Sequence, residues 1–272
     1  MKLLRWMTCI LFLVVLAGFV SMRVFLTLTE DTSQPVISVP EGVLEVSIHA
    51  DDADLLAGVT AHDEKDGDLT ALVVVESISA FIGEDTCMVM YAVADGDRHV
   101  AKATRLLRYT DYTPPHIYLN RPLVFAVGER VDFREMVGAV DCIDGDISDS
   151  ITFVASDYTS ANAGVYTLSV QVASSRGDNQ YYDFPVFVEA TTPLAPEIRL
   201  RENLIYLPVG AQPDFASYVE GVYQKGELLP GVETLINTDC DPLVPGLYTV
   251  QYFAAAPSGA VGHTVLTVIV EE

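Results

Sequence analysis

DEKDGDLT at residues 63–70 decides the fold, because the chain repeats it as DCIDGDIS at residues 141–148. A shorter, degenerate copy, YQKGEL, follows at residues 223–228. It places Gly226 where the two earlier copies have Gly67 and Gly145, so the three copies are almost evenly spaced along the chain. A regular period of this kind indicates a tandem array of small domains.

Between these acidic turns, each unit holds short apolar runs rich in β-branched and aromatic residues, separated by turn signals. In the second unit the predicted strands are residues 117–119, 123–127, 151–155, 166–173 and 182–188. Units of about 75–80 residues with such spacing suggest β-sandwiches. The expected fold is all-β, with three tandem immunoglobulin-like β-sandwiches in a rod after one N-terminal transmembrane helix.

Two linkers, at residues 113–115 and 191–196, each carry two prolines. Because proline fixes φ and restricts the residue before it, both linkers are expected to be stiff and extended. The domain boundaries that follow are residues 35–112, 113–190 and 191–272, the last unit being degenerate.

Residues 1–28 read as a membrane segment. Lys2 and Arg5 precede a charge-free run from position 6 to position 22, whose length is near the lower limit for spanning a bilayer. The basic end is expected to stay in the cytoplasm, and residues 29–34 form a tether. We favour an uncleaved signal anchor, with a cleaved signal peptide and secretion as the alternative. Either way the remaining chain is extracytoplasmic.

The 272 residues carry a formal net charge of −23. Such a surface repels nucleic-acid phosphates and anionic lipid head groups, so we expect no nucleic-acid partner. Of four cysteines, Cys9 lies in the apolar leader and Cys87, Cys142 and Cys240 follow it. An odd number in an exported region does not describe a disulfide framework, and free thiols are expected.

The combined pattern has four parts: Asp-Phe or Asp-Leu, the acidic turn, Gly-x-Tyr-Thr, and a closing apolar strand. It resembles the bacterial immunoglobulin-like repeats known as Ig-like group 3 or DUF5011, over nearly all of residues 35–272. The resemblance implies a seven-strand sandwich and an accessory, non-catalytic role at the cell surface. The first unit departs in having Cys87 where the tyrosine stands. The third departs at Tyr223 and Lys225.

The acidic turns give two triads of carboxylates, Asp63, Asp66 and Asp68 in the first unit and Asp141, Asp144 and Asp146 in the second. Carboxylates spaced closely on a loop are calcium ligands, although the EF-hand spacing is absent. The favoured interpretation is turn chemistry, in which glycine takes positive φ and aspartate bonds to nearby backbone N–H groups. No cofactor is predicted, and calcium at the triads is kept as the alternative.

A second recurring signal places Asp54, Asp132 and Asp214 before a short apolar pattern. Each aspartate is expected to cap a single helical turn whose Leu or Phe enters the core. Tyr166 and Tyr248 are expected to pack near the start of a long strand.

No catalytic motif stands out, so the sequence predicts a non-enzyme. The five histidines, His49, His62, His99, His116 and His263, share no metal spacing and are expected on surfaces or strands. The leading hypothesis is a membrane-anchored surface protein with a structural or adhesive role. The alternative is a specific glycan- or protein-binding module that uses exposed tyrosines. The candidates are Tyr109, Tyr112, Tyr118, Tyr181, Tyr182, Tyr206, Tyr218 and Tyr223.

Overall fold

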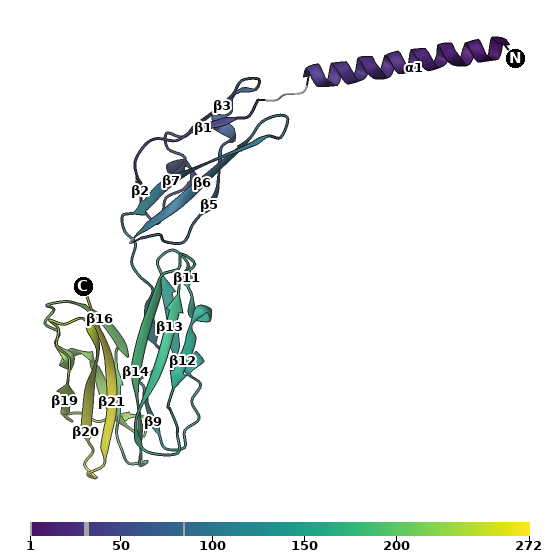
Figure 1. The fold of residues 1–272 in the computed structure, drawn as a ribbon. Helices are drawn as coiled ribbons and strands as arrows, with labels where there is room; N and C mark the ends of the chain where they lie inside the picture. The colour runs from purple at the N-terminus through teal and green to yellow at the C-terminus, as the bar shows by residue number, and fades with distance from the viewer. Residues whose placement is uncertain (1, 30–32, 84) are drawn as a thin grey trace. The chain divides into compact units, whose positions relative to one another are not determined.

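The computed structural model describes residues 2–29, 33–83 and 85–272 (Figure 1). These residues form two compact units, Met1–Thr110 and Asp111–Glu272. The first unit contains the N-terminal helix and the first repeat. The second contains the second and third repeats.

Helix α1 runs from Lys2 to Thr29. Its segment Trp6–Phe25 is 20 residues long, apolar, and without any buried share. At about 1.5 Å per residue, this segment reaches about 30 Å, the thickness of a bilayer's hydrocarbon core. The helix therefore has the length and composition of a membrane span or of a signal sequence.

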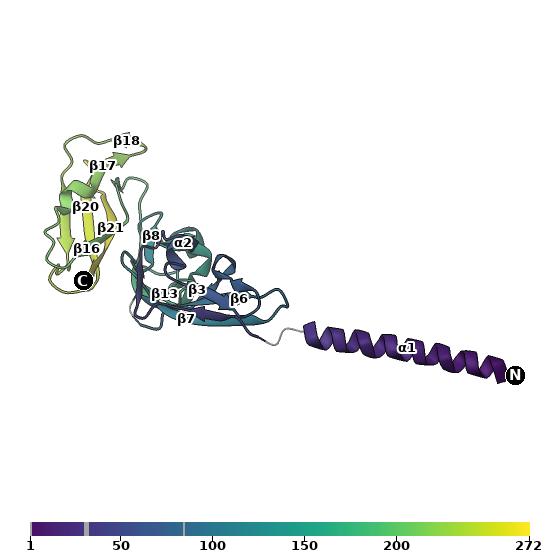
Figure 2. The ribbon, with the colours of Figure 1, turned by 90° about the horizontal axis from the view of Figure 1, so that it is seen from above.

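Each repeat is an Ig-like β-sandwich, and the same topology is built three times. One sheet has three antiparallel strands, and the other has four strands with a parallel pair at one edge. The sheet orders are β1-β3-β4 with β2-β7-β6-β5, β11-β10-β8 with β12-β13-β14-β9, and β15-β17-β18 with β16-β21-β20-β19. Figure 2 shows β17 beside β18, the hairpin that carries the third copy of the recurring turn.

The strands agree with the sequence prediction in the long runs and differ from it mainly at the strand ends. In the first repeat they are β1 (Val36–Ser38), β2 (Leu44–Val46), β3 (Thr60–Asp63), β4 (Gly67–Asp68), β5 (Val74–Ile78), β6 (Thr86–Ala94) and β7 (Val100–Tyr109). In the second they are β8 (His116–Leu119), β9 (Val124–Ala126), β10 (Val137–Asp141), β11 (Gly145–Asp146), β12 (Thr152–Ser156), β13 (Gly164–Ala173) and β14 (Asn179–Glu189). In the third they are β15 (Glu197–Leu200), β16 (Leu204–Pro208), β17 (Val219–Gln224), β18 (Glu227–Leu228), β19 (Thr234–Thr238), β20 (Gly246–Ala255) and β21 (Val261–Glu271).

The cores follow from alternation along the long strands, because successive side chains point to opposite faces. In β13, Leu168, Val170 and Val172 are buried, and the residues between them are only half-buried. In β14, Phe184 and Val186 are fully buried on the facing positions. Both strands were predicted from the sequence, at residues 166–173 and 182–188.

Short helical turns precede the acidic hairpins, as expected. Asp132 caps η2 (Phe133–Glu135) and Asp214 caps η4 (Phe215–Tyr218), and both side chains accept a backbone N–H bond. The expectation for Asp54 is wrong. Asp51 is the N-cap of α2 (Asp52–Leu55). The Asp54 carboxylate accepts a hydrogen bond from the Asp51 N–H at 3.3 Å, which completes a capping box. Two further turns, η1 (Thr70–Leu72) and η3 (Ser148–Ser150), follow the hairpins.

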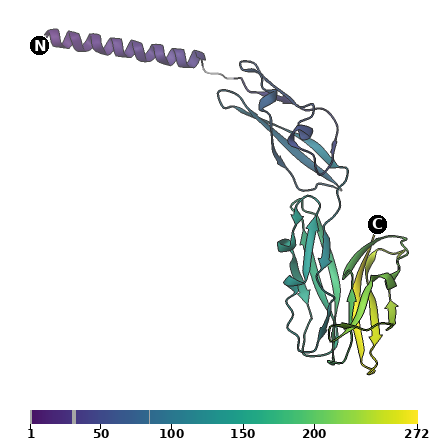
Figure 3. The same ribbon diagram turned by 180° about the vertical axis from the view of Figure 1, so that it is seen from behind.

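The second and third repeats pack side by side, as Figures 1 and 3 both show. Leu204 and Ile269 of the third repeat belong to the hydrophobic cluster of the second. Between the repeats, the Ile117 N–H donates to the Tyr206 hydroxyl at 2.8 Å, and the rings of His116 and Tyr206 stack 4.0 Å apart.

This packing corrects the expectation of an extended joint at residues 191–196. The Ala195 N–H donates to the Thr192 carbonyl at 3.0 Å, so Pro193 occupies the second position of a β-turn. Proline is favoured at that position as well as in extended spacers, because both need a φ close to the value that the proline ring fixes. Pro193 therefore lies in a reversal of the chain within this linker.

One glycine of the third repeat is required by a close backbone approach. A Cβ at Gly262 would lie 1.8 Å from the Pro196 carbonyl oxygen, whereas a Cβ at Gly246 would meet only the Tyr248 ring at 3.4 Å. We expect Gly262→Ala to lower the free energy of unfolding by about 1–3 kcal/mol, because the backbone must move. Gly246→Ala is the matched control. Urea unfolding measures both, and equal stability of the two variants would contradict this explanation.

Candidate functional site

The acidic turns are β-hairpin loops. Asp63 pairs with Gly67 across β3 and β4, and Asp141 pairs with Gly145 across β10 and β11. Each loop has three residues and is followed by a glycine that begins the next strand, with φ of +78° at Gly67 and +74° at Gly145. The chain leaves each loop through this left-handed residue, a conformation that glycine adopts without steric cost. Turns were expected here, but the short strands that flank them were missed.

The first aspartate of each triad is buried and holds the loop. Asp63 is 1% exposed and accepts from the N–H groups of Lys65 at 2.8 Å and Asp66 at 3.0 Å. Asp141 is 2% exposed and accepts from the two equivalent N–H groups, both at 2.8 Å. The carboxylate thus replaces water for two backbone donors that the sheet cannot satisfy.

The third aspartate of each triad organises the strand that leaves the loop. Asp68 accepts from the Thr70 N–H at 2.9 Å, and Asp146 from the Ser148 N–H at 3.0 Å. The hydroxyls of Thr70 and Ser148 in turn accept from a backbone N–H of the preceding strand, each at 3.1 Å. The Thr or Ser that ends the recurring stretch is therefore part of the same network.

The middle aspartate reaches to the turn between the two longest strands. Asp66 accepts from the Gly96 N–H at 2.6 Å. Asp144 accepts from the N–H and the hydroxyl of Ser175, at 2.7 and 2.6 Å. The three carboxylates of each triad thus bond to three separate sets of donors, as expected of turn chemistry. Within the described ranges, no group of three or more His, Cys, Asp or Glu side chains is placed to hold a metal ion.

The third repeat closes its hairpin differently. Gln224 pairs with Glu227, which leaves a two-residue loop of Lys225 and Gly226 with φ of +52° and +84°. Positive φ at both residues defines a type I′ turn, whose twist matches that of the strands. The third repeat lacks the buried aspartate and has a shorter loop. This loop requires Lys225, a residue with a Cβ, to adopt positive φ, which is unfavourable.

Most of the predicted tyrosine anchors are structural. Tyr109 is buried, and Tyr112 donates to Asp178 at 3.0 Å. Tyr166 and Tyr248 each donate to a carbonyl four residues upstream, those of Asn162 and Val244, near the start of a long strand as expected. The half-buried members are Tyr182, Tyr206, Tyr218 and Tyr223. Only two of the eight candidates have exposed side chains.

Those two exposed tyrosines are not equivalent. Tyr181 is 65% exposed and Tyr118 is 41% exposed. The ring of Tyr118 covers its cross-strand partner Gly138, where an added Cβ would lie 2.1 Å from the ring. Tyr181 is therefore the tyrosine that best fits the prediction of an exposed anchor.

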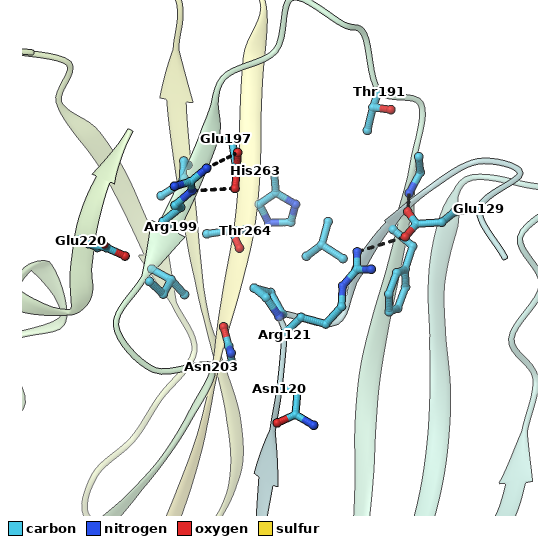
Figure 4. A pocket seen from close by; sticks show the side chains of 16 residues that line it. Asn120, Arg121, Glu129, Thr191, Glu197, Arg199, Asn203, Glu220, His263 and Thr264 are labelled. Carbon is cyan, nitrogen blue, oxygen red and sulfur yellow. Dashed lines mark hydrogen bonds and ion pairs between the residues drawn. The ribbon is translucent and has the colours of Figure 1, made fainter. Parts of the chain in front are cut away.

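The second unit also contains a polar cleft that no sequence pattern predicted (Figure 4). It has a volume of about 550 Å³ and lies between the second and third repeats. Two ion pairs line it. Arg121 lies 3.1 Å from Glu129, and Arg199 donates two hydrogen bonds to Glu197 at 2.8 and 3.2 Å. The paired residues are contributed by both repeats.

His263 lines the same cleft and lies on strand β21, in keeping with the expectation of a surface or strand histidine. Its side chain is 5% exposed, and Nδ1 lies 2.5 Å from Glu189 Oε1 of the second repeat. The ring stacks on Phe253 with centroids 4.5 Å apart. Nε2 is buried and has no hydrogen-bond partner in the described part of the chain. No sequence signal separates His263 from the other histidines, because its partners come from a different repeat.

Three cysteines lie outside the helix. Cys87 is fully buried in the first repeat. The Cys142 thiol donates to the Thr113 carbonyl at 3.2 Å beside the acidic turn. Burial, and then the neighbouring Asp239 and Asp241, raise the pKa of Cys240. A raised pKa reduces the thiolate fraction, so Cys240 is poorly suited to act as a nucleophile.

No family model matches the chain. An uncharacterised 81.3 kDa protein of Acholeplasma phage L2 is 25% identical over 172 residues, which make up 62% of this chain and 22% of that protein. The chain thus spans about a fifth of the length of this relative.

Two kinds of solved structure are similar in outline. One holds CBM51-2 in complex with GlcNAc and the INT domains of Clostridium perfringens ZmpB, with a TM-score of 0.24 and 14% identity over 88% of this chain and 42% of that one. The other is Drosophila N-cadherin EC1-3, with a TM-score of 0.31 and 12% identity over 89% of this chain and 90% of that one. At such TM-scores the likeness adds nothing to the fold that the sheets establish.

The hairpin carboxylates predict a loss of stability in acid. Hydrogen bonds from the Asp66 and Lys65 N–H groups lower the pKa of Asp63, and bonds from Thr70 and Ser148 lower the pKa of Asp68 and Asp146. A lowered folded-state pKa contributes stability above the ordinary value of 3.8, which is lost as pH falls through the folded-state pKa. The melting temperature should therefore decrease as the pH is lowered beyond about pH 4. Asp68→Asn should melt lower at neutral pH and show a shallower acid dependence; an unchanged acid profile would contradict this.

The left-handed lysine gives a second prediction. Lys225→Asn should stabilise the third repeat by about 0.5–1 kcal/mol, because asparagine tolerates the left-handed region better than other non-glycine residues. Lys65→Asn is the matched control, since Lys65 lies in a three-residue loop and is not among the residues with positive φ. Urea unfolding of both variants tests this, and an equal effect in both would show that backbone strain is not the cause.

Proposed function

We propose that this chain is a non-catalytic, membrane-anchored extracytoplasmic protein that presents tandem Ig-like domains as a structural or adhesive surface module. The observation that carries the proposal is the unburied apolar segment Trp6–Phe25 on a chain whose other described elements are those of three β-sandwiches. An apolar helix of this length is costly in water unless a bilayer or another protein covers it.

The charge distribution supports the same orientation. Lys2 and Arg5 precede the apolar segment, and the whole chain carries a formal net charge of −23. Basic residues at the start of the first helix favour a cytoplasmic N-terminus, with the repeats outside. The acidic repeats would then stay clear of anionic lipid head groups, as suits domains that project from a membrane.

Secretion after signal cleavage is the alternative address, because a signal sequence has the same helix length and composition. A specific glycan- or protein-binding role is the alternative function. The polar cleft between the second and third repeats favours it more than the tyrosines do, since most of those are packed.

Arginines in the middle of α1 test the anchor. Each arginine at the centre of a membrane helix costs about 2.5–3.5 kcal/mol on insertion scales, so Val14→Arg combined with Ala17→Arg should release the full chain from alkaline-washed membranes. Val154→Arg with Leu235→Arg is the control, because both residues are exposed on β-strands. In the unsubstituted chain, protease added outside should digest the repeats.

Mass spectrometry of the membrane-bound chain separates the two addresses. An intact N-terminus supports the anchor. A chain that begins beyond the helix overturns it in favour of secretion, and repeats protected from external protease would overturn the extracytoplasmic placement altogether.

A further inference from the structure

We infer that the cleft between the second and third repeats binds a neutral, hydroxyl-rich ligand, namely an oligosaccharide. The inference deepens the proposed function, because it gives the displayed domains a ligand class. The cleft's volume of about 550 Å³ lies within the range of about 300–1,000 Å³ found for small-molecule sites. It also lies between two domains, a frequent position for such sites.

The unpartnered nitrogen of His263 is the first indication of a ligand. When Nδ1–H of a neutral imidazole donates to Glu189, Nε2 is left as an acceptor. Nε2 is buried and accepts no hydrogen bond among the described residues. A buried acceptor without a donor is unfavourable, so a hydroxyl that reaches it is bound preferentially. Arg121, whose side chain is 45% exposed, lines the same cleft and extends toward Glu129 (Figure 4).

The other polar groups of the cleft add more acceptors than donors. Asn120 and Asn203 each donate an amide N–H to a backbone carbonyl, those of Glu135 and Leu119, both at 3.0 Å, and each side chain also carries an amide oxygen that can only accept. Glu220 accepts no hydrogen bond in the part of the chain that the structure describes, and it lines the same space (Figure 4). A set rich in acceptors is best matched by a ligand rich in O–H donors.

The pair of Glu197 and Arg199 fits adjacent hydroxyls. The carboxylate and the guanidinium lie side by side through two hydrogen bonds. Each sugar hydroxyl both donates and accepts, so two neighbouring hydroxyls can donate to the carboxylate and accept from the remaining guanidinium N–H groups. The apolar side chains of Pro122, Ile198 and Leu200 supply a surface for the C–H face of a sugar ring.

The charges favour a neutral ligand. Three carboxylates line the cleft, those of Glu129, Glu197 and Glu220, against two guanidinium groups that are already paired. The whole chain is strongly acidic as well. Uronates, sialylated sugars and sulfated sugars would meet net repulsion, and a peptide offers fewer O–H donors than a sugar.

A printed array tests the ligand class. The full chain in detergent is applied to neutral oligosaccharides printed beside sialylated, uronate-containing and sulfated ones, and the tightest neutral ligand is then titrated by calorimetry. We expect binding to a subset of the neutral sugars. Arg199→Ala should weaken it at least tenfold, while Arg201→Ala, an exposed arginine outside the cleft, should leave it within twofold.

Two variants of His263 test the central acceptor. Asparagine places an amide where Nδ1 lies and so retains a donor toward Glu189, whereas glutamine places its amide where Nε2 lies. We expect His263→Asn to lose at least tenfold in affinity and His263→Gln to retain more. If both lose affinity only in proportion to a fall in melting temperature, the histidine is an interface residue and the inference fails. Binding confined to anionic sugars, or to no sugar at all, overturns it too, while leaving the membrane fractionation result unaffected.

Discussion

A buried carboxylate that accepts hydrogen bonds from two backbone N–H groups is the constraint on which the repeat depends. A three-residue hairpin loop exposes N–H groups that the sheet cannot pair, and leaving them buried and unpaired would be costly. Asp63 and Asp141 solve this problem at the same place in two repeats. The other two aspartates tie the hairpin to the next strand and to the turn of the long hairpin, so one short stretch connects both sheets of the sandwich.

The third repeat shows what happens when this carboxylate is missing. Its hairpin loop has two residues in place of three, and the positive φ of Lys225 and Gly226 supplies the required twist. Two side chains of the same repeat, Leu204 and Ile269, are also buried in the hydrophobic cluster of the second repeat. Its divergent sequence therefore goes with a different role, in which it packs against the second repeat and encloses a polar cleft.

Local patterns made much of this fold predictable. The long strands β13 and β14, the turn glycines and the caps at Asp132 and Asp214 are all properties of a few consecutive residues, and each appears where it was predicted. The short strands around the acidic turns were missed because such brief segments carry too little periodicity. The reversal at Pro193 was missed because proline suits a β-turn and an extended spacer equally well. The cleft was beyond prediction because His263 meets Glu189 across an interface between repeats, and nothing near position 263 differs from the other histidines.

The hairpin loops have a consequence for how such repeats diversify. Within each loop, Asp63 and Asp141 grip only main-chain atoms, so their hold does not depend on which side chains the gripped residues carry. The same position accordingly holds Lys65 in one repeat and Ile143 in the other. The position of Lys65 and Ile143 is therefore a place where new surface chemistry can arise by substitution while the main-chain hydrogen bonds of the loop are kept.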